Sequence, residues 1–439
     1  MSYQSTLSYL MEQLPMYQRI GKTAYKAGLD NTIKLDNYFN RPHKAFSTIH
    51  IAGTNGKGSV SHMLASVLQD AGYTTGLYTS PHLVDFRERI KINGKQISKN
   101  FITGFIKQHK PFFDSFSPSF FELSQYIAFE WFLHNKVDIA VIETGLGGRL
   151  DATNIIEPVV SVITNIGLDH TDILGDSLEK IAAEKAGIIK PETPVIIGEY
   201  QRATMPVFEA AAREKNANLL VADQLFNIDY SLLSTDNYHV FNVKMNGELH
   251  LPGLKNELLG LYQKKNTITA LAAIAELIKS GFNLNRNNIY NGIKNVIKNT
   301  GLSGRWQTMA YNPKVICDTA HNADGLISVF RQVAETPHTK LHLIIGFVAD
   351  KDITTIMQYL PAGAIYYFTR LSVPRTLDER ELTTIAQQYG ITGRSFTNVK
   401  DAYLAAKANA GPDDLILITG STFLVGDFLA SVMQGYDFN

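Results

Sequence analysis

The stretch STIHIAGTNGKGSVSHMLASVLQDAGY, residues 47–73, decides the fold. Residues 47–52 are rich in apolar and β-branched side chains and predict a strand, whereas the apolar spacing over Ser59–Ala71 predicts a helix. Between them, GTNGKGS holds three glycines, an asparagine and Lys57. Glycines let such a loop turn its N–H groups inward, and the helix start and the lysine add positive charge. The stretch therefore predicts a phosphate cradle.

The loop differs from the standard P-loop at two positions. Ile51 stands where the pattern has its first glycine, and Gly58 separates Lys57 from Ser59. A plain glycine-rich turn between strand and helix is the alternative reading. The stretch predicts phosphate binding and names no reaction.

Composition limits the class of protein. A chain of 439 residues predicts two or more domains. Lys+Arg and Asp+Glu both number 41, which argues against a large nucleic-acid or membrane footprint. The single cysteine, Cys317, permits no intramolecular disulfide and fits a reducing compartment. The chain shows neither a leader peptide nor an apolar run of membrane-span length, so we expect a cytoplasmic protein.

Apolar, β-branched runs alternate with helical patterns along most of the chain. Such alternation predicts an α/β fold in which a doubly wound, mostly parallel sheet carries helices on both faces. The predicted strands are Ser47–Ala52, Thr75–Thr79, Val137–Glu143, Pro158–Asn165 and Pro194–Gly198, and the predicted helices are Ser59–Ala71, Glu122–His134, Ser177–Ile189 and Ala203–Lys215.

The pattern changes after residue 238. Residues 238–253 alternate around Asn246-Gly247, which predicts a hairpin, and helical patterns follow at Tyr262–Lys279 and Arg286–Lys298. A Gly/Ser-rich break at 299–304 predicts a linker between an N-terminal domain, 1–298, and a smaller Rossmann-like α/β domain, 305–439. The second domain has predicted strands at Val315–Asp318, Leu341–Phe347, Ile365–Phe368 and Leu415–Thr419. The two domains are expected to face each other across a ligand cleft.

Polar clusters follow three predicted strands, at the edge where such sheets bind ligands. Glu143 ends one strand and is a candidate magnesium ligand, or a carboxylate that caps the glycine-rich turn after it. His170 follows another strand and is a candidate ligand, or an ordinary loop residue.

Lys185 lies on the apolar stripe of its helix. Leu178, Ile181 and Ala182 form the stripe, and Lys185 continues it. A buried lysine needs a partner, a shifted pKa or a modification. The alternative, slightly favoured by the pattern alone, is a lysine whose stem covers apolar surface while its amine reaches water.

Further polar residues mark the junction. Gln263 and Asn266 lie one turn apart and also fit ordinary helix polarity. Arg305 could reach phosphates across a cleft. Asp318 could bind ribose hydroxyls, with helix capping by Asp318 or Asn322 as the alternative.

Taken in order, these segments resemble the folylpolyglutamate synthase/dihydrofolate synthase family of the Mur ligase superfamily. The matching motifs are GTNGKGS, TSPHLVDFRERIKING, ETGLGGRLDATN, DHTDILG, EKAGIIK, QKKN, GRW, DTAHN and GSTFLVGDF. The junction departs from the family pattern, with Ser303 where Pro is common, and Thr319 and Ala323 in the DTAHN segment.

The resemblance implies an ATP-dependent amide ligase. ATP would phosphorylate a carboxylate of a folate, and the amine of L-glutamate would attack the acyl phosphate. Positioning and charge neutralisation would dominate such chemistry. The partners implied are small molecules (ATP, L-glutamate, and tetrahydrofolate or dihydropteroate), and a monomer is expected.

The resemblance also assigns residues by motif. Phosphate and ATP contacts fall on Asn55, Gly56, Lys57, Gly58, Ser59, Val60, Asn266, Arg305 and Asp318. Ser59 and Glu143 would bind one Mg²⁺, and His170 a second, together with a carbamylated Lys185. The catalytic set is Lys57, His170 and Lys185. Substrate contacts fall on Ser80, Pro81, His82, Phe121, Glu122, His321 and Ser421, with Phe120 beside them.

Two other functions compete with this one. A cell-wall Mur ligase would need an additional N-terminal domain for its carrier, and the phosphate loop begins too early for that. A non-enzymatic nucleotide-binding module would not need two metal sites. Within the family, we expect the bifunctional type, which acts on dihydropteroate as well as tetrahydrofolate, with the tail-extending type as the alternative.

Overall fold

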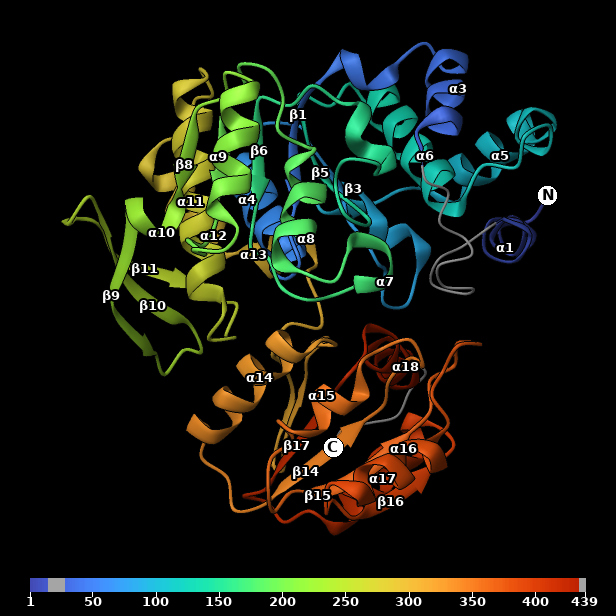
Figure 1. The fold of residues 1–439 in the computed structure, drawn as a ribbon, viewed down its shortest axis with the longest axis vertical. Coiled ribbons are helices and arrows are strands. Elements are labelled where there is room, and N and C mark those ends of the chain that lie inside the picture. Colours follow the sequence, from blue (N-terminus) through green and yellow to red (C-terminus); the bar gives the residue numbers. More distant parts are fainter. Residues whose placement is uncertain (15–27, 434–439) are drawn as a thin grey trace.

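The computed structural model describes residues 1–14 and 28–433 (Figure 1). Residues 15–27 and 434–439, which fall within the predicted domains, lie outside the described residues. The described chain forms two bodies, one above the other in Figure 1. We call residues up to Leu302 the N-terminal body and those from Ser303 the C-terminal body.

The N-terminal body is built on an eight-stranded sheet. Six strands run parallel, and β3 and β4 add an antiparallel edge. The spatial order is β4 (Lys95–Gln96), β3 (Ile90–Ile92), β2 (Thr75–Tyr78), β5 (Ile139–Glu143), β1 (Ser47–Ala52), β6 (Val160–Ile163), β7 (Val195–Ile197) and β8 (Leu219–Val221). The five predicted strands are confirmed, with ends that differ by up to two residues outside β1.

Both faces of this sheet are covered, because alternate side chains of its strands point to opposite sides. In β5, Val141 joins an apolar cluster with α4 (Lys57–Asp70), α11 (Gln263–Lys279) and α12 (Arg286–Lys294). Ile142 joins a second cluster with α5 (Lys99–Asp114) and α6 (Phe120–His134). The predicted doubly wound fold is confirmed.

A separate three-stranded sheet packs against α11 and α12. The predicted hairpin joins β10 (His239–Met245) to β11 (Glu248–Asn256). Asn246 and Gly247 have φ of 50° and 85°, as a two-residue hairpin turn requires. The edge strand β9 (Phe226–Leu233) was not predicted, because its exposed face breaks the apolar pattern.

The C-terminal body holds a six-stranded sheet with helices on both faces. Its order is β12 (Gln307–Tyr311), β13 (Lys314–Cys317), β17 (Leu415–Thr419), β14 (Leu341–Ile345), β15 (Ile365–Thr369) and β16 (Gly393–Phe396), with β12 antiparallel. The predicted strands are the four central ones, and the two edge strands were missed. The helices are α14 (Ala323–Glu335), α15 (Ile353–Met357), α16 (Glu379–Gln388), α17 (Val399–Asn409) and α18 (Thr422–Met433).

The predicted helix Arg286–Lys298 is wrong in one respect, because Asn295 interrupts it and a separate α13 (Val296–Thr300) follows. The other elements are α1 (Tyr3–Ser8), η1 (Tyr9–Gln13), α3 (Asp30–Tyr38), η3 (Pro42–Ala45), η4 (Phe86–Arg89), η5 (Ala152–Ile155), α7 (Thr171–Leu174), α8 (Leu178–Ala186), α9 (Met205–Glu214) and α10 (Ala222–Leu225).

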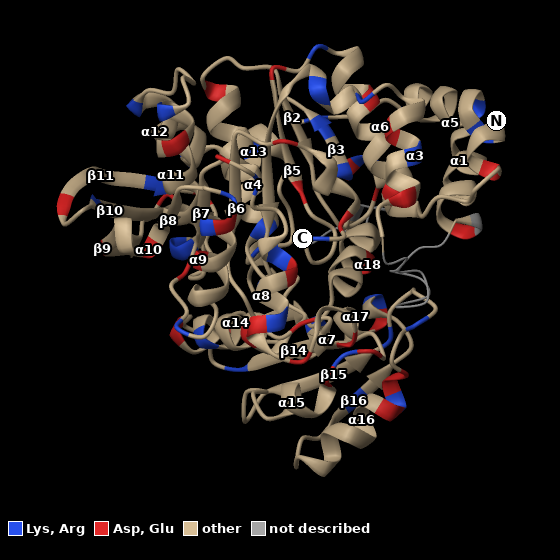
Figure 2. Ribbon diagram, turned by 45° about the horizontal axis from the view of Figure 1, so that its top comes forward, with Lys and Arg blue, Asp and Glu red and all other residues tan. Residues whose placement is uncertain are grey.

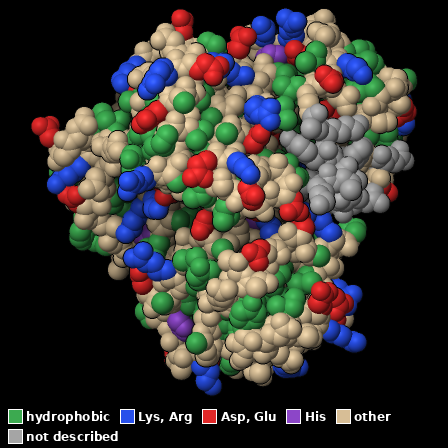
Figure 3. All heavy atoms as spheres, viewed as in Figure 1, with side chains coloured by type: hydrophobic (Ala, Val, Ile, Leu, Met, Phe, Trp, Pro, Cys, Tyr) green, Lys and Arg blue, Asp and Glu red, His purple; other side chains and the backbone are tan. Residues whose placement is uncertain are grey.

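The apolar clusters stay within one body or the other. Three belong to the N-terminal body and two to the C-terminal body, with Leu83, Leu259 and Tyr262 reaching the margins of the latter two. Charged residues of both signs occur on both bodies and are interspersed over the face in view (Figures 2 and 3). Among the described helices, none has the length and apolar character needed to cross a bilayer.

Candidate active site

The predicted phosphate loop connects β1 to α4. Gly53 and Gly56 have φ of 151° and 89°, which favour glycine. A Cβ at Gly53 would lie 1.9 Å from Thr164 Oγ1, and one at Gly56 would lie 2.4 Å from Asn266 Oδ1. The loop is therefore glycine-rich because neighbouring side chains press against its backbone.

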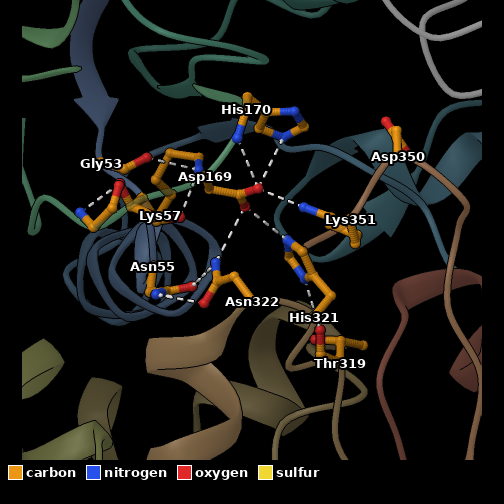
Figure 4. A network of polar contacts seen from close by, with 12 residues as sticks. Gly53, Asn55, Lys57, Asp169, His170, Thr319, His321, Asn322, Asp350 and Lys351 are labelled. Carbon is orange, nitrogen blue, oxygen red and sulfur yellow. Dashed lines mark hydrogen bonds and ion pairs between the residues drawn. The ribbon is translucent and has the colours of Figure 1, made fainter. Parts of the chain in front are cut away.

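The first turn of α4 carries no side-chain cap, so its N–H groups stay available for an anion. Lys57 Nζ donates to the carbonyls of Gly53 (2.9 Å) and Thr54 (3.2 Å), folding the side chain over its own loop (Figure 4). Phosphate oxygens would replace these two carbonyls as the acceptors of the lysine.

α11 supports the other side of α4. Gln263 Nε2 donates to Ser59 Oγ (3.1 Å), and Asn266 Nδ2 donates to Gln263 Oε1 (2.8 Å). All three side chains are buried, so this chain of amides fixes the Ser59 hydroxyl. The position of Gln263 was noted in the sequence, but its role emerges from the fold.

Glu143 ends β5 beside the phosphate loop. Its Oε2 accepts from Ser80 N (3.2 Å). Burial raises the pKa of Glu143, against the opposing charges of Lys57 and Arg305. A Cβ at Gly58 would lie 3.4 Å from Arg305 Nη2 and 3.9 Å from Glu143 Oε2, so the arginine of the C-terminal body reaches this loop.

Lys185 is buried in α8, at 3 % exposure. The side chain is therefore enclosed by the fold and does not lie along the protein surface. A second glycine-rich loop, which follows β5 and contains Gly148, covers the end of α8, and a Cβ at Gly148 would lie 2.9 Å from Lys185 O. Within the described residues, the Lys185 amine makes no hydrogen bond. Burial, reinforced by the charge of Lys57, lowers the pKa of Lys185 to about 7.

Asp169, next to His170, gathers donors from both bodies (Figure 4). Its carboxylate pairs with Lys351, with His321 Nε2 (3.3 Å) and with Asn322 Nδ2 (3.1 Å). Burial would raise the pKa of Asp169, but the nearby His170 and Lys351 and the hydrogen bond from His321 hold it well below its usual value. Burial lowers the pKa of His170 itself, which leaves a neutral imidazole.

The phosphate loop joins the same network. Asn55 Nδ2 donates to Asn322 Oδ1 (3.2 Å), and Asn322 Nδ2 donates back to Asn55 Oδ1 (3.1 Å). Asn322 also caps α14 by accepting from Gly325 N (2.9 Å). Asp169 and Lys351 were absent from the predicted site, and the only signal in the sequence was the position of Asp169 beside His170.

Arg305 and Asp318 lie together at the junction. Arg305 Nη1 donates to Thr319 Oγ1, and Arg305 Nη2 lies close to Gly58 of the phosphate loop. Asp318 accepts from Tyr262 OH (2.5 Å), Trp306 N (2.7 Å) and Ala320 N (2.9 Å). A ribose hydroxyl would have to share this carboxylate with three donors already present.

A cavity of about 220 Å³ lies between the bodies, beside the Asp169 network. Ser80, Pro81, Phe121, Glu122, His170, His321 and Ser421 all line it, as do Phe120, Arg89, Lys351 and Arg375, most of which were not predicted. Glu122 also closes the capping box of α6. His82 is absent from the described lining, and its Nδ1 accepts from Nε of Arg89 (2.7 Å), which does line the cavity.

The side chains present fit a divalent cation in part. Within residues 1–14 and 28–433, no three His, Cys, Asp or Glu side chains gather as a preformed metal site. Ser59 and Glu143 supply hard oxygen atoms next to the phosphate loop, which suits a magnesium ion that also takes phosphate oxygens. Near His170, a neutral amine at Lys185 is a poor ligand for such an ion, whereas a carbamate would be a good one.

Comparison with known proteins gives matches in both bodies. Residues 51–274 match the Mur ligase middle domain, and residues 304–422 match the Mur ligase glutamate ligase domain. The dihydrofolate synthase/folylpolyglutamate synthase of Escherichia coli is 35% identical over 88% of this chain and 86% of its own length. A probable bifunctional folylpolyglutamate synthase/dihydropteroate synthase of Haloferax volcanii is 30% identical over 97% of this chain, which spans about half of that archaeal protein.

Solved structures agree with these matches. E. coli FolC in complex with DHPP and ADP superposes with a TM-score of 0.84 and 31% identity, over 99% of this chain and 98% of that one. A bifunctional folylpolyglutamate synthase/dihydrofolate synthase with Mn, AMPPNP and L-glutamate bound has a TM-score of 0.84 and 28% identity over the same shares.

Proposed function

Since this chain belongs to the folylpolyglutamate synthase/dihydrofolate synthase family of the Mur ligase superfamily, we propose that it is the bifunctional type of ligase. The chain is an ATP-dependent ligase that uses ATP and a divalent metal on small-molecule substrates. The proposed acceptors are dihydropteroate and tetrahydrofolate, and the amine donor is L-glutamate. The observation that carries the proposal is the cavity between the bodies, which is lined by His170, His321 and Lys351 of the Asp169 network. The phosphate loop joins that network through Asn55 and Asn322.

The reaction would proceed in two steps. A carboxylate oxygen of the acceptor attacks the γ-phosphorus of ATP, so that a C–O–P linkage forms and the bond to ADP breaks. The glutamate nitrogen then attacks the acyl carbon, a C–N bond forms, and phosphate leaves as the amine loses a proton. Phosphorylation is needed because a free carboxylate is a poor electrophile.

The phosphate contacts are proposed on the loop and across the cleft. Gly56, Gly58 and Ser59 would offer N–H groups at the open start of α4, and Lys57 would turn from its own carbonyls to the outer phosphates. Asn55 and Val60 would flank the phosphates, since their own N–H groups already donate to Asn165 Oδ1 (2.8 Å) and Gly56 O (2.9 Å). Asn266, Arg305 and Asp318 would complete the ATP site. The approach of Arg305 to Gly58 supports this assignment, because it brings a guanidinium from the C-terminal body to the loop.

Two metal sites are proposed. Ser59 and Glu143 would hold one Mg²⁺, and His170 with a carbamylated Lys185 would hold the other. Bound there, the metal would neutralise charge on the phosphates during transfer. An uncharged, buried amine is the form of lysine that reacts with CO₂, and the lowered pKa of Lys185 supports this role.

The acceptor and glutamate contacts are proposed on opposite walls of the cavity. Ser80, Pro81, Phe121 and Glu122 would face the acceptor from the N-terminal body, with His82 nearby, and His321 and Ser421 would face the glutamate. The division into domains 1–298 and 305–439 with a linker at 299–304, a monomeric state and a cytoplasmic location remain proposals of the same kind.

A product-mass assay tests the proposed function. Purified protein would be incubated with ATP, Mg²⁺ and L-glutamate, with dihydropteroate in one reaction and tetrahydrofolate in another. Glutamyl addition in both establishes the bifunctional enzyme. Addition to tetrahydrofolate alone would leave the tail-extending enzyme, a type to which the folylpolyglutamate synthase of Lacticaseibacillus casei, 30% identical, belongs by name. Addition in neither would refute both.

A further inference from the structure

One buried cluster outside the site holds residues 299–301, where the connection between the two bodies leaves the N-terminal body. We call these residues the root of the connection. After α13, the chain crosses from the N-terminal to the C-terminal body (Figure 1). Lys91 of β3 is 4 % exposed, and its Nζ donates to Thr300 O (2.7 Å) and Gly301 O (3.3 Å). The lysine thus caps carbonyl groups at the end of α13 that would otherwise be buried without donors.

Residues of α4 also form hydrogen bonds with Thr300 and Asn299. The Thr300 hydroxyl donates to Val296 O (2.5 Å) and accepts from His62 Nδ1 (2.7 Å). Burial lowers the pKa of His62 well below its usual value, so the ring is neutral and donates from Nδ1–H. One turn further along α4, Ser66 Oγ accepts from Asn299 Nδ2 (3.0 Å). The helix that begins with the phosphate loop therefore also carries the root of the connection.

The anchorage continues to the next residue and then changes sides. Leu302 is 8 % exposed and belongs to the apolar cluster of the N-terminal body. Ser303 Oγ and Gly304 N both donate to Gln307 Oε1, at 2.6 Å and 2.8 Å, and so belong to the C-terminal body. The chain is thus held on both sides of a single junction, between Leu302 and Ser303.

We propose that Lys91 is a positioning residue, which fixes the connection as far as Leu302 and confines any rotation of the bodies to the Leu302–Ser303 junction. Arg305 stands three residues beyond that junction and reaches Gly58 of the phosphate loop. If the end of α13 were not held, Arg305 could be displaced from the phosphate loop, although Lys91 is not among the residues that line the cavity. This proposal rests on the proposed function for its kinetic effect, but its structural effect can be measured without turnover.

The kinetic test compares Lys91→Met with Lys91→Arg. Methionine keeps the length of the stem but donates no hydrogen bond. We expect kcat/KM for ATP to fall by roughly tenfold to a hundredfold, since small displacements of a positioning group have effects of that size. KM for the folate acceptor should stay unchanged, and Lys91→Arg should recover most of the loss. Arg286→Met is the matched control, because Arg286 donates to a main-chain carbonyl, His250 O (2.9 Å), away from the connection.

The structural test measures the distance between spin labels on exposed helix positions of the two bodies. Glu209→Cys in α9 and Gln387→Cys in α16 would carry the labels, while the native Cys317 is buried and stays unlabelled. In Lys91→Met the distance distribution should broaden relative to the parent and to Arg286→Met. Thr300→Val removes the hydroxyl's bonds to His62 and to Val296 O but leaves the main-chain carbonyls that Lys91 contacts. It should broaden the distribution less, and it tests the same anchorage if Lys91→Met does not fold.

An unchanged distribution together with an unchanged kcat/KM for ATP would overturn the proposal. If the parent shows no ligase activity, the proposed function fails, and the distance measurement still decides whether Lys91 fixes the connection.

Discussion

Removal of carbon dioxide should inactivate the enzyme through Lys185. Burial, reinforced by the charge of Lys57, lowers the pKa of this amine to about 7. At pH 7 an ordinary lysine is uncharged in about 0.03% of molecules, whereas Lys185 is uncharged in about half. The uncharged form, which is the form that reacts with CO₂, is therefore far more populated at Lys185 than at a surface lysine at the same pH.

The expected loss follows from what the carbamate supplies. Without it, the proposed metal site at His170 lacks an anionic ligand, and removal of partners of metal ligands already costs about 10–100-fold. We expect Lys185→Ala to lose at least about a hundredfold in kcat and to recover part of it with acetate, which can occupy the space of the carbamate.

The assay follows the modification and the activity together. Protein stripped of CO₂ would receive ¹³C-bicarbonate, and a carbamate signal would be sought by NMR as activity returns. The signal should weaken as pH falls through about 7, because protonation of the amine blocks the reaction. Lys190→Ala is the control, since Lys190 is a half-buried lysine bonded to Asn154 O (2.8 Å). Full activity of CO₂-free protein with no carbamate signal would refute the reasoning.

Four further predictions concern the phosphate loop, the network between the bodies and the cover of α8. Lys57→Ala should lose at least about a hundredfold in ATP turnover, measured as phosphate release, because it removes a charge from the developing phosphoryl group; near-normal turnover would contradict the phosphate-loop assignment. In a double-mutant cycle, Asp169→Asn and Lys351→Met should show about 0.5–3 kcal/mol of coupling in the free energy of unfolding, and additive effects would refute a direct pair. Because the pKa of Asp169 is depressed, its contribution is complete above about pH 4 and is lost as pH falls through the folded value, so Asp169→Asn should flatten the acid limb of the stability profile. Gly148→Ala should lower the melting temperature and the free energy of unfolding, the latter by about 1–3 kcal/mol, because its Cβ would lie 2.8 Å from Glu184 O. An unchanged melting curve would show that α8 shifts to accommodate the methyl group and would contradict the prediction.

Local pattern was sufficient for the elements whose burial is uniform. β1 and β17 are buried along most of their length, and the sequence predicts both with their observed ends. The edge strands β9, β12 and β16 were missed, because most of their residues are exposed or half-buried and their apolar alternation is weak.

The residues of the site also divide into those that a local sequence pattern predicts and those that it does not. Glycines 53 and 56 could be read as a turn, because positive φ limits the choice of residue. The pair of Asp169 and Lys351 could not, since 182 residues separate them and no local pattern records such a contact. The burial of Lys185 was also underestimated from the sequence. The apolar stripe shows on which face of the helix the lysine lies, whereas the loop at Gly148 that covers this end of the helix comes from a separate segment of the chain.

The separation of the apolar clusters has a consequence for aggregation. The buried members of each apolar core lie within one body, and the bodies meet in part through polar pairs such as Asn55 and Asn322. Leu83, Leu259 and Tyr262 of the N-terminal body pack at the margins of the C-terminal cores. If the halves part, the apolar surface that becomes wet therefore comes from such marginal residues and from the cavity lining rather than from the cores, which limits the face that could promote association with other proteins.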